Sequence, residues 1–448
     1  MKLNLTLRKA TGIMKGKLIS SHPERPLTSF VTDSRVAGPA DAFWALQGAN
    51  HDARQFIPQV IRQGANVIIA QEEGFSVPDA PDVSFLLVKD SLLALQELAK
   101  YHRLHHTLKI AAITGSNGKS TTKQMLRAIC SLAGETIANM GNFNNQFGVP
   151  FSLLEIQPKH KYGVFELGAS HPGDIDETAR LALPDVAVIT NISAAHLEFF
   201  KDLETIYQTK TEITRHINKG GTLVYNADNE YLARLKTEFM GKALSFGFGA
   251  GADVRILETD DFSFTYQTEA YRVPVRLERH DKLNAAAAVA AALALGIDTA
   301  TIAQGLQNFT PMPMRLERVE KNGVHFILDC YNANPASMHN ALTILGREKA
   351  TPRIAVLGDM KELGASSKEY HRLIAREIKE NGIETVFLAG TEMKYAYEIL
   401  KTLPTIRAIY KKTPAEWLPQ LKQALRPGAV CLFKASRSMH FENIFKEI

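Results

Sequence analysis

The chain has 448 residues, 45% of them hydrophobic and 22% charged, which excludes collagen-like, low-complexity and disordered classes and allows two to four domains. The 52 basic and 47 acidic residues give a net charge of +5. Because the basic residues are dispersed, no nucleic-acid partner is expected. The three cysteines lie far apart, which fits a reducing cytoplasm and predicts neither disulfides nor a cysteine metal site.

The N-terminal segment MKLNLTLRKATG is interrupted by polar residues, so it does not form the apolar core of a signal peptide. The longest apolar stretch, residues 285–297, is too short to span a bilayer, and we expect no membrane insertion. A polar segment at 101–107 and the prolines Pro311 and Pro313 mark weak boundaries. These boundaries predict three domains, which cover residues 1–105, 106–310 and 311–448.

Beyond residue 105, short β-rich runs alternate with helical patterns, which is typical of βαβ units. We therefore expect an α/β fold with mostly parallel sheets. The clearest predicted strands cover residues 110–114, 164–167, 186–190, 354–357, 386–389 and 429–433.

A glycine-rich loop carries the clearest chemistry in the sequence. It follows a strand predicted at 109–113 and precedes an apolar helical face of Met125, Ile129 and Leu132, which ends at Gly134. Strand, loop and helix in this order favour polyphosphate binding by backbone N–H groups and the positive helix end. The loop consists of Thr114, Gly115, Ser116, Asn117, Gly118, Lys119, Ser120 and Thr121.

Within this loop, we expect Lys119 to reach the β- and γ-phosphates and the Ser120 hydroxyl to hold Mg²⁺. The loop is not a full Walker A motif, because Ile113 stands where that motif has its first glycine. The plainer alternative is a turn that happens to contain Gly-Lys-Ser.

Two later strands end in side chains that suit a metal site. Glu166 ends the strand near 164, and His196 follows the strand near 186. Because ligands bind outside the carboxyl ends of parallel strands, we expect both to face Lys119 as Mg²⁺ ligands. Taken alone, Glu166 is a solvated carboxylate, His196 a structural histidine, and Lys210, on a predicted helix further along, a surface lysine.

Together these segments resemble the Mur ligases, the ATP-dependent amide-forming enzymes of peptidoglycan precursor synthesis. The resemblance implies a three-domain architecture, with a central P-loop-type ATPase domain on a mostly parallel sheet and a C-terminal Rossmann-like domain. It implies ATP and Mg²⁺ as cofactors, with Ser120, Glu166 and His196 as metal ligands. Lys210 falls where the family places a carbamylated lysine that also serves the metal.

The resemblance extends to the nucleotide site. His280 and Asn284 are similar to the family's element near the adenine, although Asp281 replaces the usual asparagine. Arg315 is similar to the arginine that reaches ATP from the entrance of the third domain. The implied catalytic residues are therefore Lys119, Lys210, His196 and Arg315.

Three segments, at 141–150, 331–338 and 356–364, favour the family members that join D-alanyl-D-alanine to UDP-N-acetylmuramoyl-tripeptide. These two molecules are the implied substrates. Ala435 and Ser438 replace two glycines of the family's C-terminal loop. The implied substrate-binding residues are Asp33, Ser34 and Arg35 for the UDP-sugar, and Asn144, Asn145, Asn332, Asn334, Lys434, Ser436 and Arg437 for the peptide and dipeptide.

Two alternatives remain at this point. A folylpolyglutamate synthetase shares the phosphate loop and the ligation chemistry, but it offers no reason for the segment Thr32–Arg35. A non-catalytic ATP-binding scaffold predicts nucleotide binding without acceptor-dependent ADP release. Asn332 and Asn334 have a plainer interpretation as a turn beside Pro335. We expect a monomer.

Overall fold

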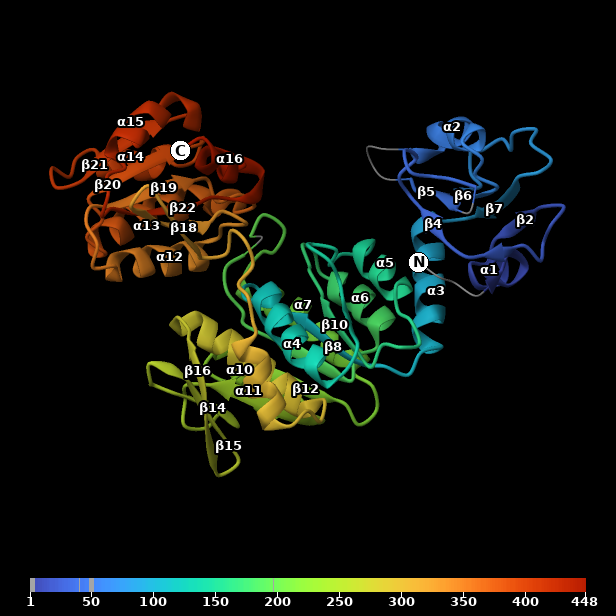
Figure 1. The fold of residues 1–448 in the computed structure, drawn as a ribbon, viewed down its shortest axis with the longest axis horizontal. Coiled ribbons are helices and arrows are strands. Elements are labelled where there is room, and N and C mark those ends of the chain that lie inside the picture. The colour runs from blue at the N-terminus through green and yellow to red at the C-terminus, as the bar shows by residue number, and fades with distance from the viewer. Residues whose placement is uncertain (1–4, 40, 48–51, 196) are drawn as a thin grey trace.

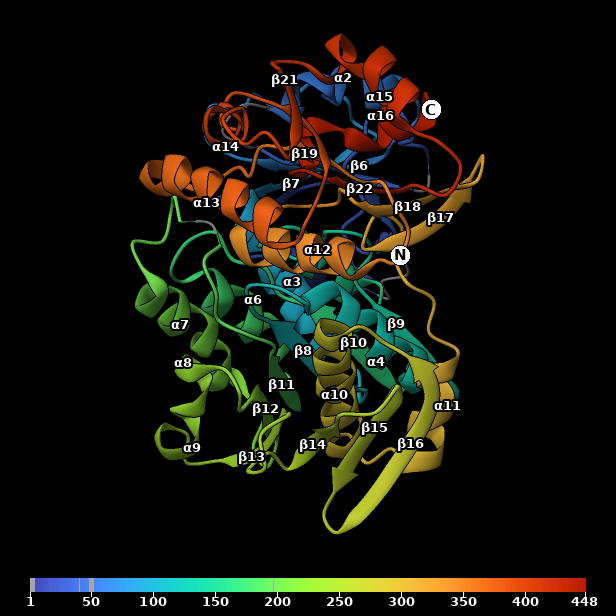
Figure 2. The same cartoon turned by 90° about the vertical axis from the view of Figure 1, so that its left-hand side faces the viewer.

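The computed structural model describes residues 5–39, 41–47, 52–195 and 197–448. Three larger sheets with their helices follow one another along the chain. Figure 1 shows the C-terminal sheet at upper left and the N-terminal sheet at upper right, with the central part below them, and Figure 2 shows the C-terminal helices α12 (Pro335–Arg347) and α13 (Ser367–Glu380) above the central part. The expected α/β fold is confirmed.

The N-terminal part contains a five-stranded sheet in the order β2-β7-β6-β5-β4 and a short antiparallel pair, β1 with β3. Only β2 runs antiparallel to its neighbour in the larger sheet. The elements are β1 (Leu5–Thr6), α1 (Leu7–Ile13), β2 (Lys17–Ile19), β3 (Pro26–Leu27), β4 (Phe30–Val31), β5 (Ala42–Ala45), η1 (Ala53–Phe56), α2 (Ile57–Arg62), β6 (Val67–Gln71), β7 (Ser84–Val88) and α3 (Ser91–Leu104).

Helix α3 joins the N-terminal part to the central part. It continues to Leu104, so most of the polar segment after residue 100 is helical. The reason is that two of its polar side chains are buried against the central part: the Arg103 Nε donates to the Ala182 carbonyl at 3.0 Å, and a His102 ring nitrogen lies 2.8 Å from the Ile156 carbonyl oxygen.

The central part is built on a nine-stranded sheet in the order β16-β15-β14-β13-β12-β11-β8-β10-β9, parallel from β9 to β14 and antiparallel at β15 and β16. Its elements are β8 (Lys109–Thr114), α4 (Lys119–Ala133), β9 (Thr136–Ala138), α5 (Gly148–Leu154), β10 (Tyr162–Glu166), α6 (Asp174–Ala182), β11 (Val186–Ile189), α7 (Leu203–Thr211), η2 (Glu212–His216), β12 (Thr222–Asn226), α8 (Glu230–Ala233), α9 (Leu235–Glu238), β13 (Lys242–Gly247), β14 (Val254–Leu257), β15 (Asp261–Tyr266), β16 (Glu269–Arg276), α10 (Arg279–Ala294) and α11 (Thr299–Gln307).

The helix after the glycine-rich loop, α4, buries a slightly different face from the predicted one. Met125 and Ile129 are buried as expected, but Leu132 is 43% exposed. Leu126 and Cys130 are buried instead, because α4 packs between the sheet, α10 and α11 and therefore needs a wider apolar stripe.

The alanine-rich stretch 285–297 forms most of α10, whose side chains are buried nearly all round. It packs against α4 and the strands β12 and β13. Its small side chains allow this close approach to the sheet. Across the described part of the chain, no helix combines the length and the apolar character that crossing a membrane requires.

The C-terminal part has a six-stranded sheet in the order β17-β18-β22-β19-β20-β21, in which only β17 is antiparallel to its neighbour. The elements not yet given are β17 (Glu317–Lys321), β18 (Val324–Asp329), β19 (Arg353–Gly358), η3 (Gly364–Ser366), β20 (Thr385–Ala389), α14 (Lys394–Leu400), β21 (Arg407–Lys411), η4 (Pro414–Glu416), α15 (Leu418–Ala424), β22 (Val430–Lys434), η5 (Arg437–Met439) and α16 (Phe441–Lys446).

Candidate active site

The glycine-rich loop folds tightly between the end of β8 and the start of α4. Gly115 and Gly118 both have left-handed φ angles, 139° and 81°. A Cβ atom at Gly115 would lie 2.0 Å from the Thr190 hydroxyl oxygen, and one at Gly118 would lie 2.2 Å from the Asn284 amide oxygen. Conformation and space therefore both require glycine at these positions.

Lys119 is half-buried at the start of α4, and its ammonium group is enclosed by the loop. Its Nζ donates to the carbonyl oxygens of Gly115 at 2.7 Å and Ser116 at 3.1 Å. Burial of the ammonium lowers the pKa of Lys119, and nearby Arg315 adds to this effect, whereas Glu166 opposes it. A positive group therefore lies inside a loop whose geometry suits a phosphate.

Ser120 and Glu166 lie side by side, as predicted. The Ser120 hydroxyl donates to Glu166 Oε2 at 2.7 Å. They meet because β10 pairs directly with β8, where Glu166 is opposite Ile113, the residue before the loop. Asn144 donates to the other carboxylate oxygen at 2.8 Å.

Glu166 is buried, with 3% exposure, and is nevertheless ionised. Burial alone raises the pKa of a carboxyl group, but the neighbouring ammonium groups of Lys119 and Lys123 outweigh it, so the pKa of Glu166 is lowered. A carboxylate and a hydroxyl oxygen in contact are hard oxygen ligands of the kind that Mg²⁺ takes.

The described residues contain no group of three or more histidine, cysteine or acidic side chains placed to hold a metal ion. This fits a Mg²⁺ site that uses one carboxylate, a hydroxyl and phosphate oxygens of the nucleotide, because Mg²⁺ is commonly bound in this way. His196, the other predicted ligand, lies outside the described residues.

Lys123 and Asn139 belong to this site, although the sequence analysis did not identify them. Lys123 is fully buried, with its Nζ 3.7 Å from Glu166 Oε2 and 2.9 Å from the Asn139 carbonyl oxygen. Asn139 exchanges two hydrogen bonds with the Glu166 backbone, each 2.9 Å long. The available signal was the spacing: Lys123 lies one turn after Lys119, on the same face of α4.

Lys210 is on α7, as predicted, but it is buried with 2% exposure, which contradicts the surface interpretation. Its Nζ lies 3.5 Å from the Ala169 carbonyl oxygen and 5.7 Å from the Phe200 ring centroid. Burial, with a further contribution from the charge of Lys119, lowers the pKa of Lys210 to about 7. At neutral pH a large fraction of this lysine is therefore an uncharged amine.

A cavity of about 400 Å³ opens beside Gly118 on the side of α10. His280, Asn284 and Arg315 line it, which brings the predicted adenine-side residues together. Asp281, the departure from the family pattern, contacts both of its neighbours: its carboxylate lies 3.4 Å from His280 Nε2 and accepts from the Asn284 amide at 3.2 Å.

A larger cavity of about 600 Å³ lies between the loop and the C-terminal sheet. Two contacts cross it. The Arg315 guanidinium donates to the Ser120 hydroxyl at 2.9 Å, and the Asn334 amide donates to the Asn117 side chain at 2.7 Å. The C-terminal part is therefore closed onto the phosphate loop.

The asparagines predicted to bind the dipeptide also have structural roles. Asn334 caps α12 through a reciprocal pair of hydrogen bonds with Ser337, so the turn interpretation and the contact with the loop both hold. The Asn332 side chain accepts the N–H of Ala333 at 2.9 Å. Asn144 and Asn145 line the larger cavity from the central part.

Among the C-terminal residues, Lys434 is buried with 1% side-chain exposure and forms an ion pair with Asp329 at 2.5 Å. Arg437 is half exposed and pairs with Glu442 at 2.9 Å. The Ser436 hydroxyl accepts the N–H of Lys361 at 2.9 Å. Lys434 therefore shapes the cavity wall, while Arg437 retains an exposed face.

The predicted UDP-sugar residues lie in the N-terminal part. Arg35 and Asp33 form an exposed ion pair of 2.6 Å, and hydrogen bonds from Arg35 lower the pKa of Asp33 to about 2. Ser34, which lies between them in the sequence, is buried. None of the three is among the described residues that line the two cavities at the phosphate loop.

Comparison with known proteins identifies the class. Residues 113–292 match the Mur ligase middle domain, and residues 314–437 match the family described as Mur ligase, glutamate ligase domain. The chain belongs to the Mur ligase family.

Individual relatives show which members of the family this chain is similar to. The chain is 33% identical to the UDP-N-acetylmuramoyl-tripeptide--D-alanyl-D-alanine ligase of Escherichia coli, over 100% of this chain and 98% of that protein. Its fold is similar to a crystal structure of MurF from Acinetobacter baumannii, with a TM-score of 0.90, 35% identity and coverage of 100% and 99%. It is also similar to MurF ligase from Thermotoga maritima in complex with ADP, with a TM-score of 0.82, 29% identity and coverage of 93% and 96%.

Proposed function

We propose that this protein is an ATP-dependent ligase that joins D-alanyl-D-alanine to UDP-N-acetylmuramoyl-tripeptide. The observation that carries the proposal is the closure of the C-terminal sheet onto the phosphate loop, through Arg315 to Ser120 and Asn334 to Asn117. This closure encloses a polar cavity large enough for reacting groups from more than one substrate. The full-length relatives named above support the same reaction.

The chemistry requires activation, because a free carboxylate has a poor leaving group. The tripeptide carboxylate attacks the γ-phosphorus of ATP, which gives an acyl phosphate and ADP. The dipeptide amine then attacks the acyl carbon, and phosphate leaves. Lys119 and Arg315 neutralise charge on the transferring phosphoryl group, which is the main task of a protein in phosphoryl transfer. Ser120 and Glu166 would hold Mg²⁺, which would supply further charge neutralisation.

We assign one substrate to each predicted domain. Residues 1–105 would bind the UDP-muramyl peptide through Asp33, Ser34 and Arg35, residues 106–310 would bind ATP, and residues 311–448 would bind the dipeptide. Closure excludes water from the acyl phosphate, which protects it from hydrolysis.

Lys210 is proposed to carry a carbamate. Only a neutral amine adds CO₂, and the lowered pKa of Lys210 makes that form available near neutral pH. The product is an anionic oxygen ligand, which converts a cation that repels Mg²⁺ into a group that attracts it. Lys210→Ala should lose activity, and acetate should restore part of it. Full activity without acetate would contradict the proposal.

The function is tested by coupled measurement of ADP release with ATP, Mg²⁺ and UDP-N-acetylmuramoyl-tripeptide, with and without D-alanyl-D-alanine. Tripeptides ending in diaminopimelate and in lysine are both supplied. Acceptor-dependent ADP release with a pentapeptide product of the expected mass supports the ligase. Nucleotide binding without such release would favour the scaffold, and ADP release with a folate and glutamate would favour the folylpolyglutamate-synthetase-like alternative.

A further inference from the structure

A third, smaller cavity of about 310 Å³ lies at the carboxyl edge of the C-terminal sheet. Asn332, Asn334, Glu362 and Arg437 line both this cavity and the larger one at the phosphate loop. The two cavities are therefore neighbours with a shared wall. A ligand in the smaller cavity can extend one end toward the reacting phosphate.

The smaller cavity has basic side chains in its lining. Lys361, Arg437 and His440 all contribute to it. Two of these three share one acidic partner: the Glu442 carboxylate lies 2.9 Å from Arg437 and 3.5 Å from His440. Lys434 adds no exposed positive charge to these three side chains, because its ammonium group is buried in the ion pair with Asp329.

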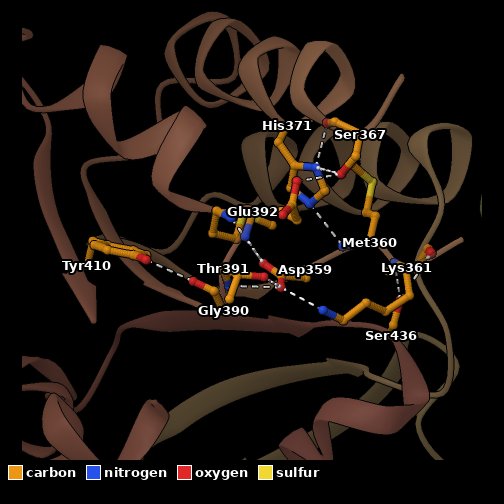
Figure 3. Close-up of polar contacts among 12 residues, drawn as sticks. Asp359, Met360, Lys361, Ser367, His371, Gly390, Thr391, Glu392, Tyr410 and Ser436 are labelled. Carbon is orange, nitrogen blue, oxygen red and sulfur yellow. Dashed lines mark hydrogen bonds and ion pairs between the residues drawn. The ribbon is translucent and has the colours of Figure 1, made fainter. Parts of the chain in front are cut away.

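Lys361 has a different kind of partner, the carboxylate of Asp359, which is 1% exposed. Figure 3 shows this carboxylate surrounded by donors from the loop after β20. It accepts the backbone N–H groups of Thr391, Glu392 and Met393, each at 3.0 Å, and the Lys361 ammonium at 2.9 Å. Lys361 contributes most to lowering the pKa of this buried carboxyl group, and the backbone N–H groups add to its effect.

The contact with Asp359 fixes the direction of the Lys361 side chain and leaves two of its ammonium protons for other partners. In the described structure the ammonium uses one of its three protons on Asp359, and the side chain is 45% exposed. The Lys361 backbone is held as well, because its N–H donates to the Ser436 hydroxyl at 2.9 Å. The next residue, Glu362, accepts the N–H of Glu198 from the central part at 3.0 Å, so this loop is also fixed on its other side.

We propose that Lys361 binds the terminal carboxylate of the acceptor dipeptide in the smaller cavity, and that Asp359 is the positioning residue that aims it. The proposal rests on the proposed ligase function. It sets the polarity of the acceptor: the carboxylate lies at Lys361, and the amine lies toward Asn334 and the phosphate loop, where it must attack. Neither residue belongs to the substrate-binding set expected from the sequence.

The test compares two acceptors, D-alanyl-D-alanine and its C-terminal amide, which lacks the negative charge. Both are assayed with the wild-type protein, Lys361→Met, Lys361→Arg and the control Lys368→Met, which removes an exposed lysine of α13 outside both cavities. Loss of a hydrogen bond to a charged group predicts that Lys361→Met raises the KM for the acid about 10- to 100-fold. The KM values for ATP and UDP-N-acetylmuramoyl-tripeptide should stay unchanged.

The preference for acid over amide is the decisive quantity. It should be about 10-fold or more in the wild type and in Lys368→Met, close to one in Lys361→Met, and partly restored in Lys361→Arg. A preference that survives in Lys361→Met, or is absent from the wild type, would overturn the proposal, and so would parallel KM increases for all three substrates. If the wild type shows no acceptor-dependent ADP release at all, the ligase function itself fails, and the proposal falls with it.

Discussion

Replacing Lys210 by methionine should stabilise the protein while removing its activity. The lysine side chain is 2% exposed, and burial lowers its pKa from the usual 10.5 to about 7. In the unfolded chain the same amine is protonated up to about pH 10.5. Folding near neutral pH therefore carries a free-energy cost, because the amine must either lose its proton or be buried as a charge. Methionine fills a similar volume without that cost.

The magnitude follows from the two pKa values. One pKa unit corresponds to about 1.4 kcal/mol, so the cost approaches about 5 kcal/mol below pH 7, is about 4 kcal/mol at pH 7.5 and about 1.4 kcal/mol at pH 9.5, and disappears above pH 10.5. Because folding depresses the pKa of this base, the folded protein gains stability as pH rises from 7 to 10.5. The stability gap between Lys210→Met and wild type should therefore shrink with increasing pH.

The assay is thermal melting together with hydrogen exchange of α7, at pH 6, 7.5 and 9.5, in buffer freed of CO₂ and Mg²⁺. Lys201→Met, an exposed substitution in the segment before α7, is the matched control. Added bicarbonate should stabilise the wild type and leave Lys210→Met unchanged, because only the lysine can form a carbamate. A wild type that melts at or above Lys210→Met at pH 6 would refute the reasoning.

Four further substitutions test the site. Lys119→Ala should reduce kcat about 10²- to 10³-fold, equivalent to about 3–4 kcal/mol, with an unchanged circular dichroism spectrum, and near-normal kcat would contradict its role. Gly118→Ala should weaken ADP binding, measured by calorimetry, because φ of 81° and the Asn284 side chain 2.2 Å from the new Cβ both oppose it; wild-type affinity would show that the loop adapts. Arg315→Ala should lower kcat with little change in the dipeptide KM. Arg437→Ala should instead raise the dipeptide KM more than the KM values of the other substrates. Equal KM changes for all three substrates in Arg437→Ala would reject the idea that the C-terminal part selects the dipeptide.

The phosphate loop could be predicted from sequence because its signal is local. Strand, glycine-rich turn and helix follow one another within about 25 residues, and each glycine is required by the conformation of its own backbone. Glu166 required one further step, the rule that parallel strands present ligands at their carboxyl ends. Its contact with Ser120 depends on β10 lying beside β8, and that pairing order is a property of the whole sheet.

The residues that sequence reasoning missed are buried charges. Lysine is read as exposed because burying it alone is unfavourable, so Lys123 was missed despite its spacing from Lys119, and Lys210 was interpreted, without the family resemblance, as a surface residue. Their burial becomes acceptable only through partners that are distant in sequence, such as Glu166 for Lys123. Lys361 was missed for a related reason, because its orienting partner Asp359 is held by backbone groups of residues 391–393.

The sum of these charges explains why the site suits its ligands. The charges of Lys119 and Lys123 lower the pKa of Glu166, while Lys210 lies near the positive charge of Lys119 and the negative charges of Asp174, Glu212 and Glu166. Like charges at short range and low dielectric repel, which is costly in a folded protein unless an anion joins them. A triphosphate would supply that anion next to Lys119, and the carbamate proposed on Lys210 would add a further negative charge. The positive charges that surround Glu166 are thus also the property that favours binding of a polyphosphate.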